Sequence, residues 1–318
     1  MKTAARYKAV WELMTAVFAD RQPADNIINA YFRERRFIGS GDRRFIAEKI
    51  WHIIRRRRRL TFEAGSADPR KLLIAYLKDE DLAEIFAGGE YGLPPLNDDE
   101  RKLAAALRTE ERTYPPAVEC ECPDWLFAKI GDPLLLKALN EPAGADFRVC
   151  RGSREEVLRL LENEGFEAVP TPYSPLGIRL PTRINLNNCM AYQDGLIEVQ
   201  DEASQLAALM CGIRPEDRII DYCSGAGGKA LALAAQLKGQ GVIEAHDINP
   251  QRLEQLKPRL ARLCIGNVKI VPSAEEKPVY TRFIIDAPCS GTGAADRSAL
   301  RPDRDRSGLR PGLSGDHP

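Results

Sequence analysis

The chain has 318 residues, of which 44% are hydrophobic and 29% charged, with 46 basic and 46 acidic side chains. This composition suits two or three packed domains and excludes wholesale disorder. No apolar run approaches the roughly 20 residues of a membrane-spanning helix, and the N-terminus lacks a signal-peptide pattern. Eight cysteines are too few for a disulfide scaffold. We therefore expect a cytoplasmic protein with reduced cysteines.

The zero net charge conceals an uneven distribution. Residues 1–65 carry 15 Lys and Arg against 7 Asp and Glu, a net of +8, whereas residues 66–146 carry 9 against 17, a net of −8. A solvated helix end often carries a basic run, but arginine also binds phosphate through two hydrogen bonds at once. We predict nucleic-acid contact at the densest run, which is Arg55, Arg56, Arg57, Arg58 and Arg59.

Apolar side chains recur at three- and four-residue steps through the first 140 residues, which is the spacing of helices that pack on a core. Cys120 and Cys122 have no second cysteine pair and no histidine close in the sequence, so we predict no metal site there. Helices are expected over 10–18, 27–32, 45–54, 72–77 and 103–107.

The next sixty residues have the pattern of a small α/β module. A helix is expected from Arg154 to Gly165, because Ser153 can cap its start and glycine suits its end. A second helix is expected over 202–211, after the module. Strands are expected at 147–150, 178–180 and 196–199.

Residues 218–286 alternate between strand and helix patterns, which predicts a parallel sheet covered by helices. Pro258 should kink or shorten the second of these helices. Residues 294–318 contain no aromatic residue, valine or isoleucine, so we expect this tail to be disordered. The strands are expected at 218–223, 241–247, 267–271 and 282–286, and the helices at 229–237 and 250–263.

A glycine-rich turn follows the first of these strands, in the sequence Asp221-Tyr-Cys-Ser-Gly-Ala-Gly-Gly-Lys229. Glycines let a backbone approach a ligand closely, and the helix start offers free N–H groups to an anion. The next strand ends at Asp247, where a carboxylate can accept hydrogen bonds from ribose hydroxyls. The pattern therefore predicts a nucleotide-type site.

Three ligands compete for this turn. A phosphate-binding P-loop is excluded, because Cys223 and Ala230 stand where it needs glycine and Ser or Thr. A dinucleotide site is allowed, since Gly225, Gly227 and Ala230 fit its spacing. The third candidate is S-adenosylmethionine, with its carboxylate near the helix start and its ribose at Asp247.

A second motif, Asp286-Ala-Pro-Cys-Ser-Gly-Thr-Gly293, follows the last strand. It places a carboxylate and the Cys289 thiol at the carboxyl end of that strand, where open α/β sheets bind ligands. A lone cysteine is more often a small buried hydrophobe. A thiolate that adds to carbon 6 of a pyrimidine, however, makes carbon 5 nucleophilic enough to accept a methyl group. The motif thus favours pyrimidine methylation over dehydrogenase chemistry.

With these residues in view, the sequence resembles the S-adenosylmethionine-dependent RNA cytosine-C5 methyltransferases of the RsmB/Nop/Sun family. The match covers Asp221–Lys229, Asp247, Asp286–Gly293 and the segment Val199–Gln205. The resemblance implies methylation of cytosine carbon 5 in ribosomal RNA, with 16S rRNA as the expected target. It also implies a monomer that acts on RNA, with no membrane and no metal.

The resemblance further assigns residues to the cofactor, S-adenosyl-L-methionine. Asp247 would hold its ribose and Asp286 would lie beside it, while the loop residues would line it. These loop residues are Cys223, Ser224, Gly225, Ala226, Gly227, Gly228 and Lys229.

The implied fold is a Rossmann-like methyltransferase sheet, incomplete at its C-terminus, preceded by a small α/β module and an all-α N-terminal domain. The expected division is a NusB-like RNA-binding domain (1–140), an RNA-recognition-like module (141–200), a partial methyltransferase domain (201–293) and an atypical tail (294–318).

One departure from the family bears on activity. In the family, the cysteine that matches Cys289 assists release of the methylated base, and a second cysteine on the following strand is the nucleophile. No cysteine follows Cys289 here. We expect impaired catalysis and a tail that arose by frameshift or gene truncation. A non-catalytic RNA-binding remnant and an NAD-dependent oxidoreductase stay open as alternatives.

Overall fold

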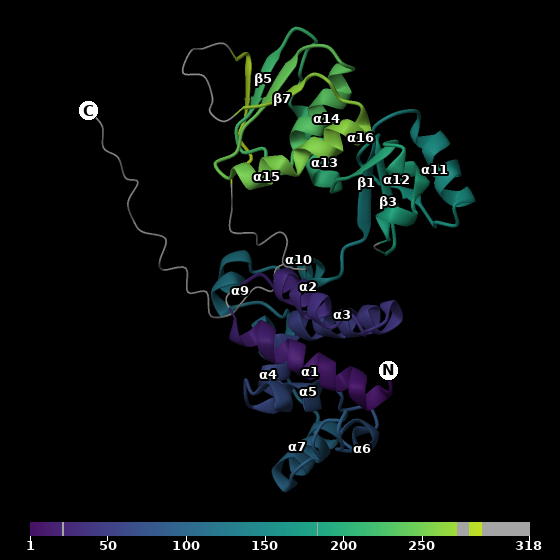
Figure 1. The fold of residues 1–318 in the computed structure, drawn as a ribbon. Helices are drawn as coiled ribbons and strands as arrows, with labels where there is room; N and C mark the ends of the chain where they lie inside the picture. The colour runs from purple at the N-terminus through teal and green to yellow at the C-terminus, as the bar shows by residue number, and fades with distance from the viewer. Residues whose placement is uncertain (21, 183, 272–279, 288–318) are drawn as a thin grey trace. The chain divides into compact units, whose positions relative to one another are not determined.

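The structure is a computed structural model that describes residues 1–20, 22–182, 184–271 and 280–287 (Figure 1). The chain forms two units, which divide between Pro142 and Ala143. Each described element of the first unit is a helix. These are α1 (Thr3–Ala19), α2 (Ala24–Glu34), α3 (Ser40–Arg55), α4 (Arg57–Ala64), α5 (Pro69–Tyr76), α6 (Leu82–Ile85), α7 (Asp98–Thr109), α8 (Pro116–Glu119), α9 (Asp124–Ile130) and α10 (Pro133–Asn140).

The predicted apolar stripes become the core of this helical unit. Leu13 of α1, Ile50 of α3 and Leu72 of α5 are fully buried in one cluster. Burial of each such side chain stabilises the unit by about 1.5–3 kcal/mol relative to an exposed one. Four of the five helical stretches that periodicity predicted lie within helices α1, α2, α3 and α7, and the fifth, 72–77, extends one residue past the end of α5.

An antiparallel sheet with the strand order β2-β3-β1-β4 begins the second unit. The expected helix starts after Ser153, whose hydroxyl accepts from the Glu156 N–H while the Glu156 carboxylate accepts from the Ser153 N–H. The elements are β1 (Ala145–Val149), α11 (Arg154–Asn163), β2 (Val169–Pro170), β3 (Gly177–Leu180), η1 (Leu186–Asn188), α12 (Met190–Gln193) and β4 (Ile197–Val199).

A parallel sheet with the strand order β7-β6-β5-β8 follows in the same unit. β5 pairs with β6 on one side and with β8 on the other, so the ends of β5 and β8 meet at one edge. The elements are α13 (Glu202–Met210), β5 (Arg218–Asp221), α14 (Gly228–Leu237), β6 (Val242–Ala245), α15 (Pro250–Glu254), α16 (Leu256–Leu263), β7 (Val268–Ile270) and β8 (Arg282–Ile284).

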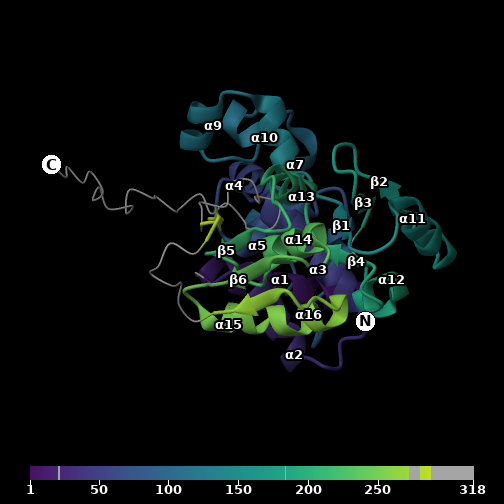
Figure 2. The same ribbon diagram turned by 90° about the horizontal axis from the view of Figure 1, so that it is seen from above.

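The predicted break in the helix over 250–263 is confirmed. Gln255 separates α15 from α16, and Pro258 lies three residues further on (Figure 2). Proline cannot donate to the carbonyl four residues before it, here that of Glu254, and its ring crowds that carbonyl. The helix therefore ends at Glu254 and restarts at Leu256.

The predicted fold class is confirmed as a mixed α/β chain with a helical N-terminal region and a parallel sheet. The tail over 294–318 and the Cys289 motif from Pro288 onward lie outside the described residues. Among the residues that are described, no helix is both long and apolar enough to cross a membrane.

Candidate functional site

The turn between β5 and α14 depends on two glycines. Gly225 and Gly227 have φ values of +56° and +85°, which other residues adopt only at a cost. A Cβ on Gly227 would lie 2.2 Å from the Leu256 side chain, and a Cβ on Gly225 would lie 2.5 Å from the Arg252 guanidinium. The positive φ values therefore favour glycine at both positions, and a larger residue would also require the Leu256 or Arg252 side chain to move.

Asp247 lies directly beside this glycine loop. Its Oδ2 accepts from the Gly225 N–H at 2.8 Å, and its Oδ1 accepts from the Asn249 N–H at 2.8 Å. The Ser224 N–H donates to the His246 carbonyl at 2.8 Å, which holds the loop against the end of β6. The two sequence features that predicted a nucleotide-type site are thus in direct contact.

The two glycine-bearing motifs also meet at this edge of the sheet. The Lys229 ammonium, in the first turn of α14, lies 2.6 Å from Oδ2 of Asp286, which follows β8. Asp286 is more than half exposed, whereas most of the Lys229 side chain is covered. Cys289, three residues beyond Asp286, is outside the described residues, so its predicted role stays a prediction.

Asp221 is a candidate site residue that the sequence argument did not single out. It is only 1% exposed, and its Oδ2 accepts from the Ala230 N–H at 3.1 Å. Burial raises the pKa of its carboxyl to about 6, although Ser224, the Ala230 N–H and Lys229 oppose the rise. Asp221 Oδ1 and the Ser224 hydroxyl are both buried at the start of the glycine loop. The sequence feature that could have identified Asp221 is its position as a carboxylate at the end of a buried strand.

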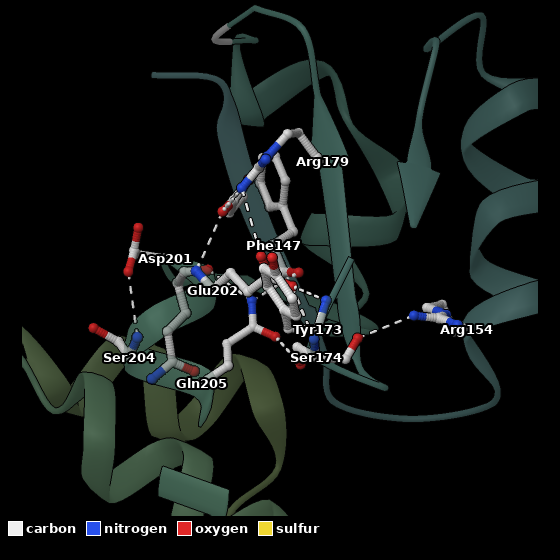
Figure 3. Close-up of polar contacts among 11 residues, drawn as sticks. Phe147, Arg154, Tyr173, Ser174, Arg179, Asp201, Glu202, Ser204 and Gln205 are labelled. Atoms are coloured by element: carbon white, nitrogen blue, oxygen red, sulfur yellow. Dashed lines mark hydrogen bonds and ion pairs between the residues drawn. The ribbon is translucent and has the colours of Figure 1, made fainter. Parts of the chain in front are cut away.

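The segment Val199–Gln205, part of the recognised resemblance, joins the antiparallel sheet to α13 (Figure 3). Asp201 caps α13 by accepting from the Ser204 N–H at 3.2 Å. Glu202 accepts from the N–H groups of Tyr173 and Ser174 at 2.7 and 2.8 Å. These polar side chains therefore fix the start of α13 to the loop before β3.

Gln205 completes this connection from a buried position. Its amide nitrogen donates to the carbonyls of Gln200 and Phe147, and its amide oxygen accepts from the Ser174 hydroxyl at 2.7 Å. Buried polar groups satisfied in this way specify one arrangement of the chain. In the described structure, the segment Val199–Gln205 therefore connects the antiparallel module to α13.

The arginine run of the first unit makes varied contacts within its own unit. Arg55 ends α3, Arg56 is exposed at the break, and α4 starts at Arg57. Arg58 forms an ion pair with Asp124, and the Arg59 guanidinium lies near Glu121 and over the Tyr114 ring. Part of the run thus supports the packing of the helical unit, and its contact with RNA stays a prediction.

A parallel sheet with a glycine loop and acidic strand ends at one edge is typical of Rossmann-like nucleotide-binding sheets, the fold class to which S-adenosylmethionine-dependent methyltransferases belong. The crystal structure of PH0851 shares this fold with a TM-score of 0.71 at 19% identity, over 96% of this chain and 80% of that chain. Residues 208–307 match the family model of the 16S rRNA methyltransferase RsmB/F.

Curated relatives agree with this family model. Ribosomal RNA small subunit methyltransferase B of Pseudomonas syringae pv. tomato is 35% identical over 270 residues, which cover 74% of this chain and 59% of the relative. The enzyme of the same name from Proteus mirabilis is 30% identical over 189 residues, which cover 55% and 44%. The chain thus spans about half the length of these relatives. Residues 208–307 are therefore similar to an RsmB/F-type methyltransferase domain, and the predicted resemblance to the RsmB/Nop/Sun family is confirmed.

Proposed function

We propose that the chain binds S-adenosylmethionine at the glycine loop and serves methylation of cytosine carbon 5 in 16S ribosomal RNA. The observation that carries this proposal is the meeting of three features at one sheet edge: the glycine loop, Asp247 and the Lys229–Asp286 pair. The named rRNA methyltransferases among its relatives support the substrate class. The Pro-Cys motif supports cytosine as the base.

The residues at this edge fit the cofactor. The N–H groups of Gly228 and Lys229, at the start of α14, have no carbonyl partner within the helix and can donate to the carboxylate of the cofactor, and nothing lies within 4 Å of a Cβ built on Gly228. The Asp247 carboxylate has lone pairs to spare for ribose hydroxyls. The buried Asp221 carboxyl and Ser224 hydroxyl can meet further polar groups. When bound, the cofactor supplies an electrophilic methyl group.

Three side chains would act at the reacting end of this site. Lys229 and Asp286 would lie beside the cofactor and hold each other in place through their ion pair. Cys289 would assist release of the methylated base. Since no other cysteine follows it in this sequence, we propose that the 318-residue chain, assayed alone, binds cofactor and RNA but transfers little methyl.

Isothermal titration with S-adenosylmethionine, and separately with NAD, tests the cofactor. We expect binding of the first only. Asp247→Ala should weaken it at least about tenfold, because a pair of hydrogen bonds to the ribose is lost. Glu254→Ala serves as the matched control, because Glu254 is an exposed carboxylate at the end of α15 that pairs with Lys257. Binding of NAD alone, or of neither ligand, would contradict the proposal.

RNA is the proposed partner, bound in the cytoplasm by a monomer. The basic segment 1–65 supports this, with exposed arginines at positions 33, 36, 44 and 56. Binding of a 16S rRNA fragment should weaken steeply between 50 and 200 mM salt, as about one counterion is released per phosphate contact. Arg56→Gln should make the salt dependence shallower. Binding that is equally strong at both salt concentrations would argue against an RNA partner.

A further inference from the structure

Glu198 of β4 is a carboxylate buried between two arginines of α16. Its side chain is 3% exposed; Oε1 lies 3.2 Å from Arg259 Nη2, and Oε2 pairs with Arg262 Nη2. A buried carboxylate is stable only when it is paired and hydrogen-bonded. The small antiparallel module therefore contributes the anion that orients both guanidinium groups.

Arg259 reaches from this carboxylate to the glycine loop. Its second terminal nitrogen, Nη1, donates to the Ala226 carbonyl at 2.5 Å. One planar guanidinium thus joins Glu198 on β4 to the loop between β5 and α14. Arginine is suited to this task because its donors have a fixed relative geometry.

Arg262 and Gly195 fix α16 against the module. Arg262 Nη1 donates to the Tyr192 carbonyl at 2.5 Å and to the Ile197 carbonyl at 3.1 Å, and its guanidinium lies 3.8 Å from the centre of the Tyr192 ring. A Cβ on Gly195 would lie 2.4 Å from the Arg262 carbonyl oxygen, so the backbones approach closely. Arg259 therefore extends from a helix that the module holds in place.

Gln200, just after β4, makes a second connection to the same loop. Its amide nitrogen donates to the Gly228 carbonyl at 3.1 Å, and its amide oxygen accepts from Arg148 Nε at 2.7 Å. Arg148 belongs to β1 and lies directly across from Glu198 in the sheet. The Ala226 carbonyl is thus held by Arg259, which Glu198 pairs with, and the Gly228 carbonyl is held by Gln200 of the small module.

We propose, on the basis of the proposed cofactor site, that Glu198 and Arg259 are positioning residues for the glycine loop. Glu198 orients Arg259, and Arg259 holds the Ala226 carbonyl, so the small module sets the shape in which the loop receives its ligand. Neither residue needs to touch the cofactor.

Hydrogen exchange and isothermal titration with S-adenosylmethionine test this together. In Arg259→Met, we expect amides of the peptide over 222–230 to exchange about tenfold faster and the cofactor to bind about tenfold more weakly. Glu198→Gln, which contacts no loop residue, should shift both measurements in the same direction. Lys257→Met removes a positive charge from the same helix without touching the loop and should change neither.

The double variant shows whether the two residues act through one another. If Glu198 works through Arg259, the Glu198→Gln, Arg259→Met protein should be no worse than Arg259→Met alone. Fully additive losses, or unchanged loop exchange in Glu198→Gln, would overturn the proposal.

Hydrogen exchange is measured without cofactor, so it tests the positioning role even if the wild-type chain binds no S-adenosylmethionine. That failure to bind would refute only the proposed function. Arg259→Lys keeps the charge and should give a smaller change, which answers the question if Arg259→Met fails to fold.

Discussion

Each unit of the molecule contains a buried glutamate near arginines, and the two are satisfied very differently. In the helical unit, Glu121 Oε2 accepts from the Arg59 N–H at 3.0 Å, but its Oε1 has no hydrogen-bond partner among the described residues, and the Arg59 Nε is 3.7 Å away. Burial raises the pKa of Glu121 to about 7, against the opposing effect of Arg59. In the second unit, both oxygens of Glu198 meet a guanidinium.

The difference shows that the spacing of arginines matters more than their number. Arg259 and Arg262 are three residues apart on one helix, so both point to the same side and converge on one carboxylate. The five consecutive arginines of the first unit point in several directions. Arg57 lies over the Phe18 ring, and Arg58 pairs with Asp124. A dense run therefore need not satisfy a buried anion.

The largest effect is expected for Arg262→Met. This change leaves Glu198 paired with one guanidinium, and it removes the donor from the Tyr192 and Ile197 carbonyls. We expect it to destabilise the second unit by about 3–5 kcal/mol. All three tryptophans, at positions 11, 51 and 125, belong to the first unit. The urea unfolding curve measured by circular dichroism should therefore shift to lower urea, while the curve measured by tryptophan fluorescence should stay the same.

Arg252→Met is the control for that prediction. Its side chain is 53% exposed and lies 3.4 Å from Asp247, so its loss should cost at most about 1 kcal/mol. If Arg262→Met lowers the free energy of unfolding no more than Arg252→Met does, the pairing around Glu198 is not what holds the module to α16.

Glu121→Gln should have the next largest effect, and it should depend on pH. Because the folded-state pKa is raised to about 7 from its ordinary value of 4.5, the stability that this carboxyl contributes is present below pH 4.5 and is lost as the pH rises through 7. The loss is at most about 3 kcal/mol. The variant lacks this titration, so it should gain stability over wild type at pH 8 but not at pH 4.5.

Urea unfolding followed by tryptophan fluorescence measures this difference, since the tryptophans report on the helical unit. Glu119→Gln, an exposed neighbour paired with Lys137, is the matched control and should not gain stability at pH 8. An equal difference between Glu121→Gln and wild type at both pH values would show that Glu121 is as well paired as Glu198.

The smallest effect is expected for Asp124→Asn. Asp124 is 80% exposed, so its pair with Arg58 is screened by water and should contribute less than about 1 kcal/mol. Fluorescence-detected unfolding at low and high salt checks this value. A larger loss that disappears in salt would mean that the arginine run contributes more to the helical unit than its geometry indicates.

Local chemistry was enough to predict much of the fold. The Ser153–Glu156 capping box, the proline break before α16 and the helical stripes each depend on residues within a few positions of one another. The glycine loop was also predictable, because its conformation excludes other residues. Five of the seven predicted strands were one to three residues too long, whereas β1 and β3 are each one residue longer than predicted, since side-chain patterns do not show where pairing with a neighbour starts and stops.

By itself, the sequence determined five helices of the first unit, the alternation of strands and helices in the second, the glycine loop and the acidic residue that follows the next strand. Only the tertiary structure decided which charges meet. Glu198 lies about sixty residues from Arg259 and Arg262, and Lys229 is 57 residues from Asp286. The tertiary structure also raises the pKa of Asp221, because the fold buries its carboxyl. Burial and ion pairing depend on distances through space, which the packing of the sheets and helices sets and no local pattern encodes.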